Sequence, residues 1–474
     1  MNRPPTGFSE IVTIGGLSQF ASFKKQNSSI FLLACREIVD LQTQSKGSLS
    51  AHEYFSRVVP VLMFLRHVFG DQTWHNPKRC ASFIIDDPLL RKSYGFLNYS
   101  RLLAEMDSRE FTASIAFIPW NHKRTHPDVA KLMRERSDRF TVCVHGCDHT
   151  EAEFASMDVR ELNTRIHLAS QRMKAHERRT GVPYAEVMVF PQGEFSSVSL
   201  GVLKGHNYLA AVNTSIIPRT TRNGAPASFP LFMRRYPRNL ADFAFDLFVG
   251  KPALVVEHHG YFRQGYEKIR EFTTQLNSPK LRWMGLGELV RHTYLQRSVS
   301  PDTVECRIFA NRQILDNPAP RGKSFIIYKP EGNEIPIGEV AVNGKQHPYF
   351  AEHDHMRLYV DVPASSETEV TIKYAPTAQY ASNSEGQSFR QQAQVYLRRY
   401  LSTVRDNYLS KHDKLSFAGV PTEGRKAFRL MSASTQETLC QPVVGTVHTN
   451  SLSCEFGFSE PTHLCSLQRG TVRH

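Results

Sequence analysis

The sequence predicts an α/β protein with a (β/α)7–8 barrel, a C-terminal β-sandwich module and a terminal helix. Three observations support this prediction. Between residues 76 and 298, short apolar segments alternate with longer amphipathic segments, which is typical of parallel strands joined by helices. Over 299–376, short alternating strands are separated by Pro, Gly and Asn. Residues 377–411 then repeat apolar side chains at helical spacing.

We expect residues 1–75 to form a mainly helical region, because apolar side chains recur at helical spacing over 30–42 and 54–68. The longest uncharged apolar run, Val58–Leu65, is far shorter than the roughly 20 residues of a membrane-spanning helix. The N-terminus lacks the basic-then-apolar order of a secretory signal. The sequence therefore predicts a cytoplasmic protein without a transmembrane segment.

In the barrel region, the apolar segments expected to be strands are Cys80–Asp86, Phe111–Phe117, Phe140–Val144, Glu186–Phe190, Tyr208–Asn213, Leu231–Arg235, Ala253–Glu257 and Leu281–Met284. The amphipathic segments expected to be helices are Tyr99–Met106, Asp128–Arg136, Asp158–Thr180, Tyr266–Leu276 and Gly287–Gln296.

In the sandwich region, the expected strands are Val304–Phe309, Ser324–Tyr328, Glu339–Val342, Arg357–Val362 and Glu369–Tyr374. The terminal helix carries Leu397, Leu401, Val404 and Tyr408 on one face, with Arg398, Arg399, Arg405 and Lys411 among its polar positions. Such a helix can lie on a membrane, but we expect it to dock against its own domain. Residues 412–474 are rich in Ser and Thr, and we expect a poorly ordered tail.

The chain is basic, with 58 Lys and Arg against 45 Asp and Glu. These charges are spread from Arg3 to Arg473 rather than clustered among aromatic side chains, so no specific nucleic-acid partner is expected. The 8 cysteines are too few for a disulfide scaffold in a chain of 474 residues. The oligomeric state does not follow from the sequence.

Two segments place metal-binding residue types at the ends of expected strands. ASFIIDDP ends in Asp86 and Asp87, and TVCVHGCDHT carries His145 and His149. Histidines four residues apart on a helical turn lie about 5–6 Å apart at Cβ, close enough to share one ion. Zinc binds imidazole and carboxylate groups, and three protein ligands plus water form its catalytic arrangement. Asp87, His145 and His149 would make such a set.

Two alternatives remain open for these residues. Asp87 could instead cap the N-terminus of a helix that follows the strand. Cys143 and Cys147 alternate with the histidines, as in a structural Cys2His2 zinc site. An extended chain would spread those four ligands over about 20 Å, so the second alternative requires a sharp turn.

Two further segments end in candidate functional residues. VMVFPQGEFSS ends a strand with Pro191 and Gly193, a rigid turn that lets the backbone approach a ligand. ALVVEHHGYF ends a strand with His258 and His259, whose ordinary pKa suits proton transfer near neutral pH. Aromatic side chains that could stack on a sugar ring, or simply pack, are Trp74, Trp120 and Tyr261.

The order of these motifs over residues 80–290 resembles the polysaccharide deacetylases, the NodB-homology or carbohydrate esterase 4 superfamily. The resemblance implies a distorted deacetylase-type (β/α)7 barrel that removes acyl groups, such as acetyl, from a polysaccharide or a related amide or ester. It implies that Asp86 is the catalytic base and that His258 or His259 is the general acid. It also implies a divalent metal, expected to be Zn²⁺, on Asp87, His145 and His149. We expect Pro191, Gly193, Trp120 and Tyr261 on the substrate side.

The sequence departs from the family pattern at three points. Pro88 follows the two aspartates where the family has Gly, and no counterpart of the fourth motif is found. Val189 and Phe190 precede the Pro-x-Gly turn without the arginine that orients the base in the family. These departures allow a second hypothesis, a glycan-binding or exopolysaccharide-handling protein with impaired catalysis on the same scaffold.

Overall fold

The computed structural model of the chain describes residues 7–26, 28–34, 50–150, 152–219, 228–277, 281–332, 335–375 and 389–411. The tail 412–474 and the segments 35–42 and 377–388, which carry some of the expectations above, lie outside the described residues. No helix among the described residues is both long enough and apolar enough to cross a lipid bilayer.

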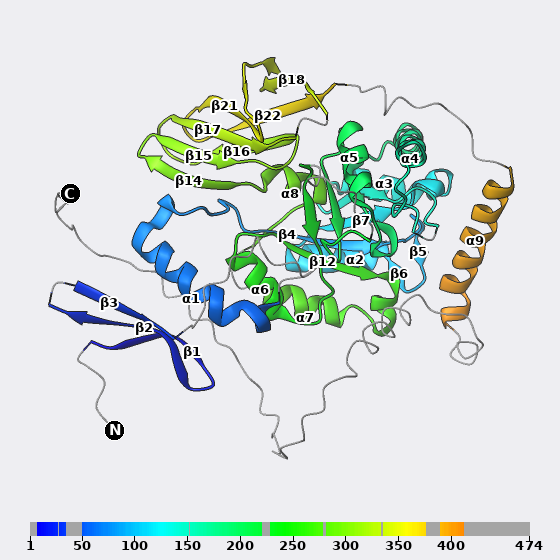
Figure 1. Cartoon of the computed structure of the whole chain (residues 1–474). Coiled ribbons are helices and arrows are strands. Elements are labelled where there is room, and N and C mark those ends of the chain that lie inside the picture. Colours follow the sequence, from blue (N-terminus) through cyan, green and yellow to red (C-terminus); the bar gives the residue numbers. More distant parts are fainter. Residues whose placement is uncertain are drawn as a thin grey trace. The chain divides into compact units, whose positions relative to one another are not determined.

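Within the described residues, seven parallel strands form a barrel (Figure 1). Their order is β11 (Leu231–Met233), β10 (Ala210–Asn213), β9 (Ala185–Val189), β8 (Phe140–His145), β7 (Ala113–Phe117), β4 (Cys80–Asp86) and β12 (Ala253–His258). Arg235, just beyond β11, forms a parallel bridge with Val255 of β12 and so closes the ring. The short strand β13 (Arg282–Trp283) pairs with β4. The predicted barrel is confirmed.

Helices pack around this barrel and across one of its ends. The helices of this part are α2 (Tyr99–Arg109), α3 (Pro127–Glu135), α4 (Val159–Thr180), α5 (Ser197–Gly205), α6 (Leu240–Phe248), α7 (Glu267–Leu276) and α8 (Leu286–His292). A Cβ on Gly287 of α8 would lie 2.6 Å from Cβ of Ala185, the first residue of β9. Because glycine permits this close approach, α8 covers the end of the barrel where the strands begin.

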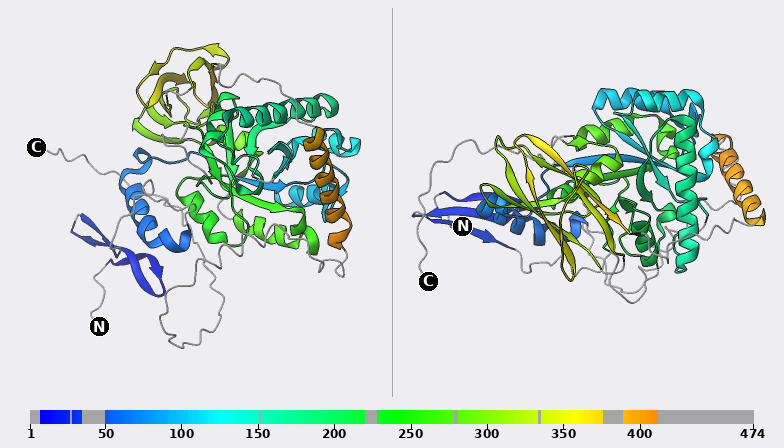
Figure 2. Two further views of the ribbon diagram at one scale, coloured as in Figure 1. Left: turned by 45° about the vertical axis from the view of Figure 1, so that its right-hand side comes forward. Right: turned by 90° about the horizontal axis from the view of Figure 1, so that it is seen from above.

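Two β-sheets follow the barrel, one mixed and one antiparallel (Figure 2). One sheet has the order β14 (Leu295–Ser300), β15 (Thr303–Arg307), β17 (Lys323–Pro330), β21 (His355–Val362) and β20 (Phe350–Ala351), in which β15 and β17 run parallel. The other has β16 (Arg312–Asn317), β22 (Ser366–Tyr374), β18 (Ile337–Val342) and β19 (Lys345–Gln346). Buried side chains of both sheets, including Ile327 and Val370, form one core, so the predicted β-sandwich is confirmed.

The helix expected over Gly287–Gln296 is wrong at its C-terminal end. Helix α8 ends at His292, and Gln296 lies in β14, opposite Cys306 of β15. The segment pairs with β15 along Leu295–Ser300, and this pairing overrides its local helical pattern.

The expectation of a mainly helical N-terminal region is also wrong in part. Strands β1 (Ser9–Ile14), β2 (Leu17–Lys25) and β3 (Ser28–Leu33) form an antiparallel sheet, and only then does α1 (Ala51–Phe69) follow. Gly15 and Gly16 join β1 to β2 with φ angles of 57° and 76°. Two glycines at positive φ are a hairpin signal, and the helical interpretation of Ile30–Gln42 overlooked this hairpin.

The terminal helix α9 (Phe389–Asn407) ends in a 3-10 turn at Leu409–Lys411. This helix contacts the barrel, for example through Asp406 and Thr403, but the face that carries the leucines points away from it. Leu397, Leu401 and Tyr408 are 58%, 57% and 66% exposed, whereas Arg399 and Asp406 are buried. The prediction that the helix docks against its own domain is confirmed, and the contacts are mainly hydrogen bonds of polar side chains.

Candidate functional site

Strand geometry brings polar side chains to the end of the barrel opposite α8. Ile84, Cys143 and Val256 belong to the core cluster inside the barrel. Because alternate residues of a strand share a face, the residues two positions later in β4, β8 and β12 point to the same interior. Those residues are Asp86, His145 and His258, each at the carboxyl end of its strand. The site therefore lies where the active sites of α/β barrels lie.

Strand β4 ends between two carboxylates. Asp86 is its last residue, and Asp87 has a φ of 68°, in the left-handed region. Neighbouring residues in a strand point to opposite faces. Because the backbone changes direction at Asp87, both carboxylates can nevertheless lie at the same end of the barrel. The helix-cap alternative for Asp87 is wrong, because the next helix, α2, is capped by Asn98.

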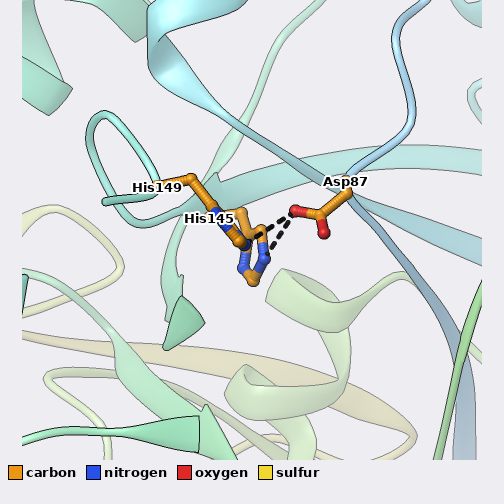
Figure 3. Close-up of side chains that lie close together, drawn as sticks. All are labelled: Asp87, His145 and His149. Atoms are coloured by element: carbon orange, nitrogen blue, oxygen red, sulfur yellow. Dashed lines mark ion pairs between the residues drawn. The ribbon is translucent and has the colours of Figure 1, made fainter. Parts of the chain in front are cut away.

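Asp87 meets two imidazoles at the barrel mouth (Figure 3). Its Oδ1 lies 3.0 Å from His145 Nε2 and 3.1 Å from His149 Nε2. The candidate ligand atoms of the three residues all lie within 4.8 Å of one another, and they form the one such His, Cys, Asp or Glu group found in the part of the chain that the structure describes.

The three side chains fit a divalent cation. Ligand bonds of about 2.1 Å in a tetrahedral zinc site put the ligand atoms about 3.4 Å apart, close to the distances seen here. Asp87 Oδ1 is buried and has no hydrogen-bond partner of regular geometry, although the Nε2 atoms of both imidazoles lie within 3.1 Å of it. Burial alone would raise the pKa of Asp87, but the charges of His149 and His145 hold that pKa well below its ordinary value. An ionised carboxylate and two imidazoles are a donor set that zinc accepts.

The backbone orients His145. Its Nδ1 lies 2.9 Å from the carbonyl oxygen of Val189 on the neighbouring strand β9. When Nδ1–H donates to this carbonyl, the lone pair of Nε2 points toward Asp87. Such an outer hydrogen bond sets the tautomer of metal-binding histidines.

His149 reaches the site from a loop rather than from the helical turn we expected. His145 is the last residue of β8, and His149 has a φ of 56°. Glu153, which the sequence analysis missed, holds this loop by accepting the backbone N–H groups of Cys147, Asp148 and His149 at 2.9, 3.1 and 3.2 Å. No residue spacing signals this role, because Glu153 binds backbone atoms.

The loop also requires a glycine. Gly146 has a φ of 65°, and a Cβ there would lie 2.1 Å from Glu153 Oε1. The sharp turn brings the rings of His145 and His149 to a centroid distance of 5.0 Å. The same turn separates the cysteines: Cys143 lies in the core inside the barrel and Cys147 in the core outside it. The Cys2His2 alternative is therefore wrong.

Asp86 is paired with an arginine that the sequence analysis also missed. Arg234 Nη1 lies 2.6 and 2.7 Å from the two carboxylate oxygens of Asp86. Both side chains are buried. Burial alone would raise the pKa of Asp86, but Arg234, with His145 and His258, lowers it below its ordinary value. Asp86 is therefore an ionised carboxylate inside the barrel mouth.

Arg234 corrects the expectation that Asp86 lacks an orienting arginine. It lies one residue beyond β11, and its Nη2 is 3.5 Å from the carbonyl oxygen of Phe190, the residue before the Pro-x-Gly turn. A signal was present, since Arg234 shares the inward position of Phe232 in the strand expected over Leu231–Arg235. A charged residue at an inward position requires a partner.

The structure separates the two histidines after β12. His258 Nε2 is 4.0 Å from Asp86 Oδ2, and its side chain is 42% exposed. His259 Nε2 instead lies 3.6 Å from Asp406 Oδ1 of α9, and its ring packs against Tyr94 and Phe96. His258 therefore faces the site, and His259 does not. Burial raises the pKa of the adjacent Glu257 to about 7.

The expected substrate-side residues lie in different surroundings. Pro191 and Gly193 form a 3-10 turn beside the histidine loop, with Gln192 Oε1 accepting the N–H of Ala152 at 3.4 Å. The backbone N–H of Trp120 donates to the carbonyl oxygen of Cys147 at 3.1 Å, and the Trp120 ring contacts the ring of Tyr396 of α9.

The other two aromatic candidates contact side chains other than those of the metal group. Tyr261 packs against Phe83 and Phe262, with ring centroids 6.4 and 5.6 Å away. Trp74 packs under Arg297 and Arg307, whose guanidinium carbons lie 5.0 and 4.6 Å from its ring centroid. These contacts are packing contacts, and they leave a sugar-stacking role without support at either position.

No protein-family model and no curated protein matches the sequence. Several solved structures are similar in fold. A CE4 family pseudoenzyme from Bacillus anthracis is 13% identical, with 46% of this chain and 67% of that chain covered and a TM-score of 0.31. A variant of the peptidoglycan deacetylase PdaC from Bacillus subtilis is 12% identical, with 46% and 92% covered and a TM-score of 0.31. A family 4 carbohydrate esterase from Bacillus anthracis is 13% identical, with 49% and 92% covered and a TM-score of 0.31. Identities and TM-scores of this size do not place the chain in a family.

Proposed function

We propose that this chain is a divergent polysaccharide deacetylase, a metal-dependent hydrolase that removes acyl groups from a carbohydrate or a related amide or ester. One observation carries the proposal: the two carboxylates at the end of β4 have different partners. Asp86 is paired with Arg234, and Asp87 with the imidazoles of His145 and His149. Adjacent carboxylates in separate environments can perform separate tasks, one as a base and one as a ligand.

Asp87, His145 and His149 would hold the divalent cation, which we propose to be zinc. Such an ion, when bound, lowers the pKa of a water from about 15.7 toward 7 and polarises an acyl carbonyl. The contact of His145 Nδ1 with the Val189 carbonyl oxygen and the glutamate-held loop of His149 keep the ligand set in place.

The remaining steps belong to the side chains around this group. Asp86, ionised and fixed by Arg234, accepts the proton of the attacking water. His258, 4.0 Å from Asp86 and partly open to solvent, donates a proton to the leaving amine or alkoxide. His259 takes no part in this scheme, since its contacts are with α9 and aromatic side chains. The turn at Pro191 and Gly193 lies beside the histidine loop, where it can contact the substrate.

The competing hypothesis is a glycan-binding protein with impaired catalysis. Its main support was the absent third-motif arginine. Arg234 pairs with both carboxylate oxygens of Asp86 and would supply the orienting cation, which supports hydrolysis over the binding hypothesis.

Metal analysis combined with acetate release from a panel of acetylated glycans tests the proposal. We expect a stoichiometric divalent metal and acetate release, with Asp86→Asn retaining the metal and losing about 10²–10⁴-fold in rate. Asp246→Asn is the matched control, because Asp246 forms the neighbouring pair with Arg235 at 2.6 Å. It should be active. Bound metal without hydrolysis of any acyl substrate would instead support the binding protein.

A further inference from the structure

Helix α9 contacts the barrel through polar side chains. Tyr94 Oη donates to Asp406 Oδ2 at 2.5 Å, and the N–H of Gly95 donates to Asn407 Oδ1 at 3.0 Å. Arg124 Nη2 donates to Thr403 Oγ1 at 3.1 Å. The side of the helix that faces the barrel is therefore its hydrogen-bonding side.

The opposite side of α9 carries an exposed apolar surface, which we call the outer stripe. Its members are Phe389, Leu397, Tyr400, Leu401 and Tyr408, which are 84%, 58%, 55%, 57% and 66% exposed, while Tyr396 at its edge contacts Trp120 of the barrel. These positions follow the 3–4 and 7–8 residue spacing of one helix face. Helices of soluble domains normally bury such a face, and a contiguous exposed apolar surface marks a site of interaction.

The charges around the outer stripe have one sign. Residues 389–411 contain five Lys and Arg and a single acid, Asp406; of these cations Arg399 is buried against the barrel and Arg405 pairs with Asp406. Asp406 is 6% exposed and is bound to Tyr94, so it does not reach the outer surface. Arg390 and Lys411 are exposed near the two ends of the helix. The outer surface is therefore apolar and aromatic along its length, with cationic groups beside it.

Charge complementarity selects the occupant of this surface. A second copy would pair the stripe with itself about a twofold axis and set like charges against each other. The tail 412–474 holds six Lys and Arg against five Asp and Glu, so it brings no compensating negative charge. An anionic lipid surface matches both features, because leucine enters the acyl boundary, tyrosine lies at the headgroups, and arginine and lysine meet the negative charge.

We propose that the outer stripe of α9 binds the surface of a membrane that contains anionic lipids. This inference goes beyond the hydrolase proposal and does not depend on it. It has a consequence for the site, since Arg399 of α9 lies 3.3 Å from the carbonyl oxygen of His149 on the opposite side of the helix. A membrane bound to the stripe would therefore lie directly over the helix that contacts the metal-ligand loop.

Vesicle sedimentation of the full chain tests the proposal, with vesicles of phosphatidylcholine alone and of phosphatidylcholine mixed with phosphatidylglycerol. We expect binding to the mixed vesicles only, falling as salt increases. The triple variant Leu397→Ser, Tyr400→Ser, Leu401→Ser should lose at least about tenfold in binding. Its matched control replaces Val299, Phe350 and Tyr359 of the sandwich by Ser, because these side chains are similarly exposed at 53%, 55% and 48%. That control should bind like the parent.

A second variant tests the proposal even if the triple variant of the outer stripe does not fold. Arg390→Glu with Lys411→Glu changes only exposed charges and should weaken binding to the mixed vesicles while acetate release and circular dichroism stay unchanged. The proposal is overturned if the parent does not sediment with anionic vesicles, or if the stripe variant binds as well as the parent. It is also overturned if light scattering shows a dimer that the stripe substitutions dissociate, since the occupant is then a second copy.

Discussion

Arg234 and Asp86 are 148 residues apart in the sequence and form a buried ion pair at the mouth of the barrel, with oxygen distances of 2.6 and 2.7 Å. The pair joins the strands β4 and β11, which are not neighbours in the sheet order. It keeps one carboxylate charged in a place where burial would otherwise favour its neutral form.

Arg234→Met should leave Asp86 buried without its cation. The pKa of Asp86 should rise, so the acid limb of the pH–rate profile should move to higher pH, because the base must be ionised to act. The free energy of unfolding should fall by about 3–5 kcal/mol, measured by urea denaturation. Arg235→Met, which breaks the pair with Asp246, should lose stability without moving the acid limb. An unchanged acid limb in the Arg234 variant would refute the assignment of Asp86 as the base.

His145→Ala and His149→Ala should each strip the metal, because three ligands are needed to hold it. Metal content after gel filtration, measured by plasma mass spectrometry, provides the check. His259→Ala is the matched control, since His259 contacts Asp406 rather than Asp87. Equal metal content in the His145 variant and the parent would remove the ligand assignment.

Glu153→Ala should release the loop that carries His149. Removal of the carboxylate leaves several backbone N–H groups without an acceptor, so the unfolding free energy should fall by about 2–4 kcal/mol and metal affinity should fall with it. Isothermal titration with zinc and thermal unfolding measure the two effects. Glu135→Ala, an exposed acid of α3 whose partner is Lys131 at 3.8 Å, should change neither. Full zinc affinity in the Glu153 variant would show that the loop holds without it.

Glu257→Gln should stabilise the protein at alkaline pH. The pKa of Glu257 is raised to about 7 in the folded chain, so the folded state holds this proton more tightly than the unfolded state, whose pKa is near 4.5. The destabilisation of the folded state by ionised Glu257 is therefore absent below pH about 4.5, grows as the pH rises to about 7, and is constant above that pH. The variant should gain on the order of 3 kcal/mol at pH 8 and nothing at pH 4, as measured by urea denaturation. An equal gain at both pH values would contradict the ionisation of Glu257 as the cause.

Arg399→Met should increase metal affinity by about tenfold. Arg399 is 8% exposed, and its Nη2 lies 3.4 Å from Nδ1 of His149. A buried cation beside a divalent cation site opposes binding through charge repulsion. Competition with a zinc chelator gives the affinity, and Arg398→Met provides the control for the loss of one charge from α9. A weaker zinc affinity in the Arg399 variant would contradict this prediction. It would mean that the hydrogen bond from Arg399 to the loop of His149 favours metal binding more than the charge of Arg399 opposes it.

The barrel strands were predictable because their signal is local. Short apolar segments such as Cys80–Asp86 and Ala253–His258 must be buried on both faces, and nothing in the tertiary structure competes with that pattern. The N-terminal sheet was missed because the apolar residues around Ile30 fit a helical spacing, while the paired glycines Gly15 and Gly16 allow a hairpin. Short apolar segments of this kind are ambiguous until their partners are known.

The chemistry-bearing residue types at the strand ends were visible in the sequence: Asp86 and Asp87 after one strand, His145 and His149 after another, and His258 after a third. The residues that position these side chains could not be recognised from the sequence. Arg234 reaches Asp86 across the barrel, Glu153 binds backbone N–H groups, and Arg399 approaches His149 from a separate helix.

The sequence by itself thus determined the order of the barrel strands and the residue types at the strand ends, because periodicity and strand termination depend on neighbours in the chain. Only the tertiary structure decided which histidine faces the mouth, which arginine neutralises Asp86, and which face of α9 meets the barrel. These choices depend on the closure of the ring between Arg235 and Val255 and on contacts over long sequence separations, where burial and charge act through space rather than along the chain.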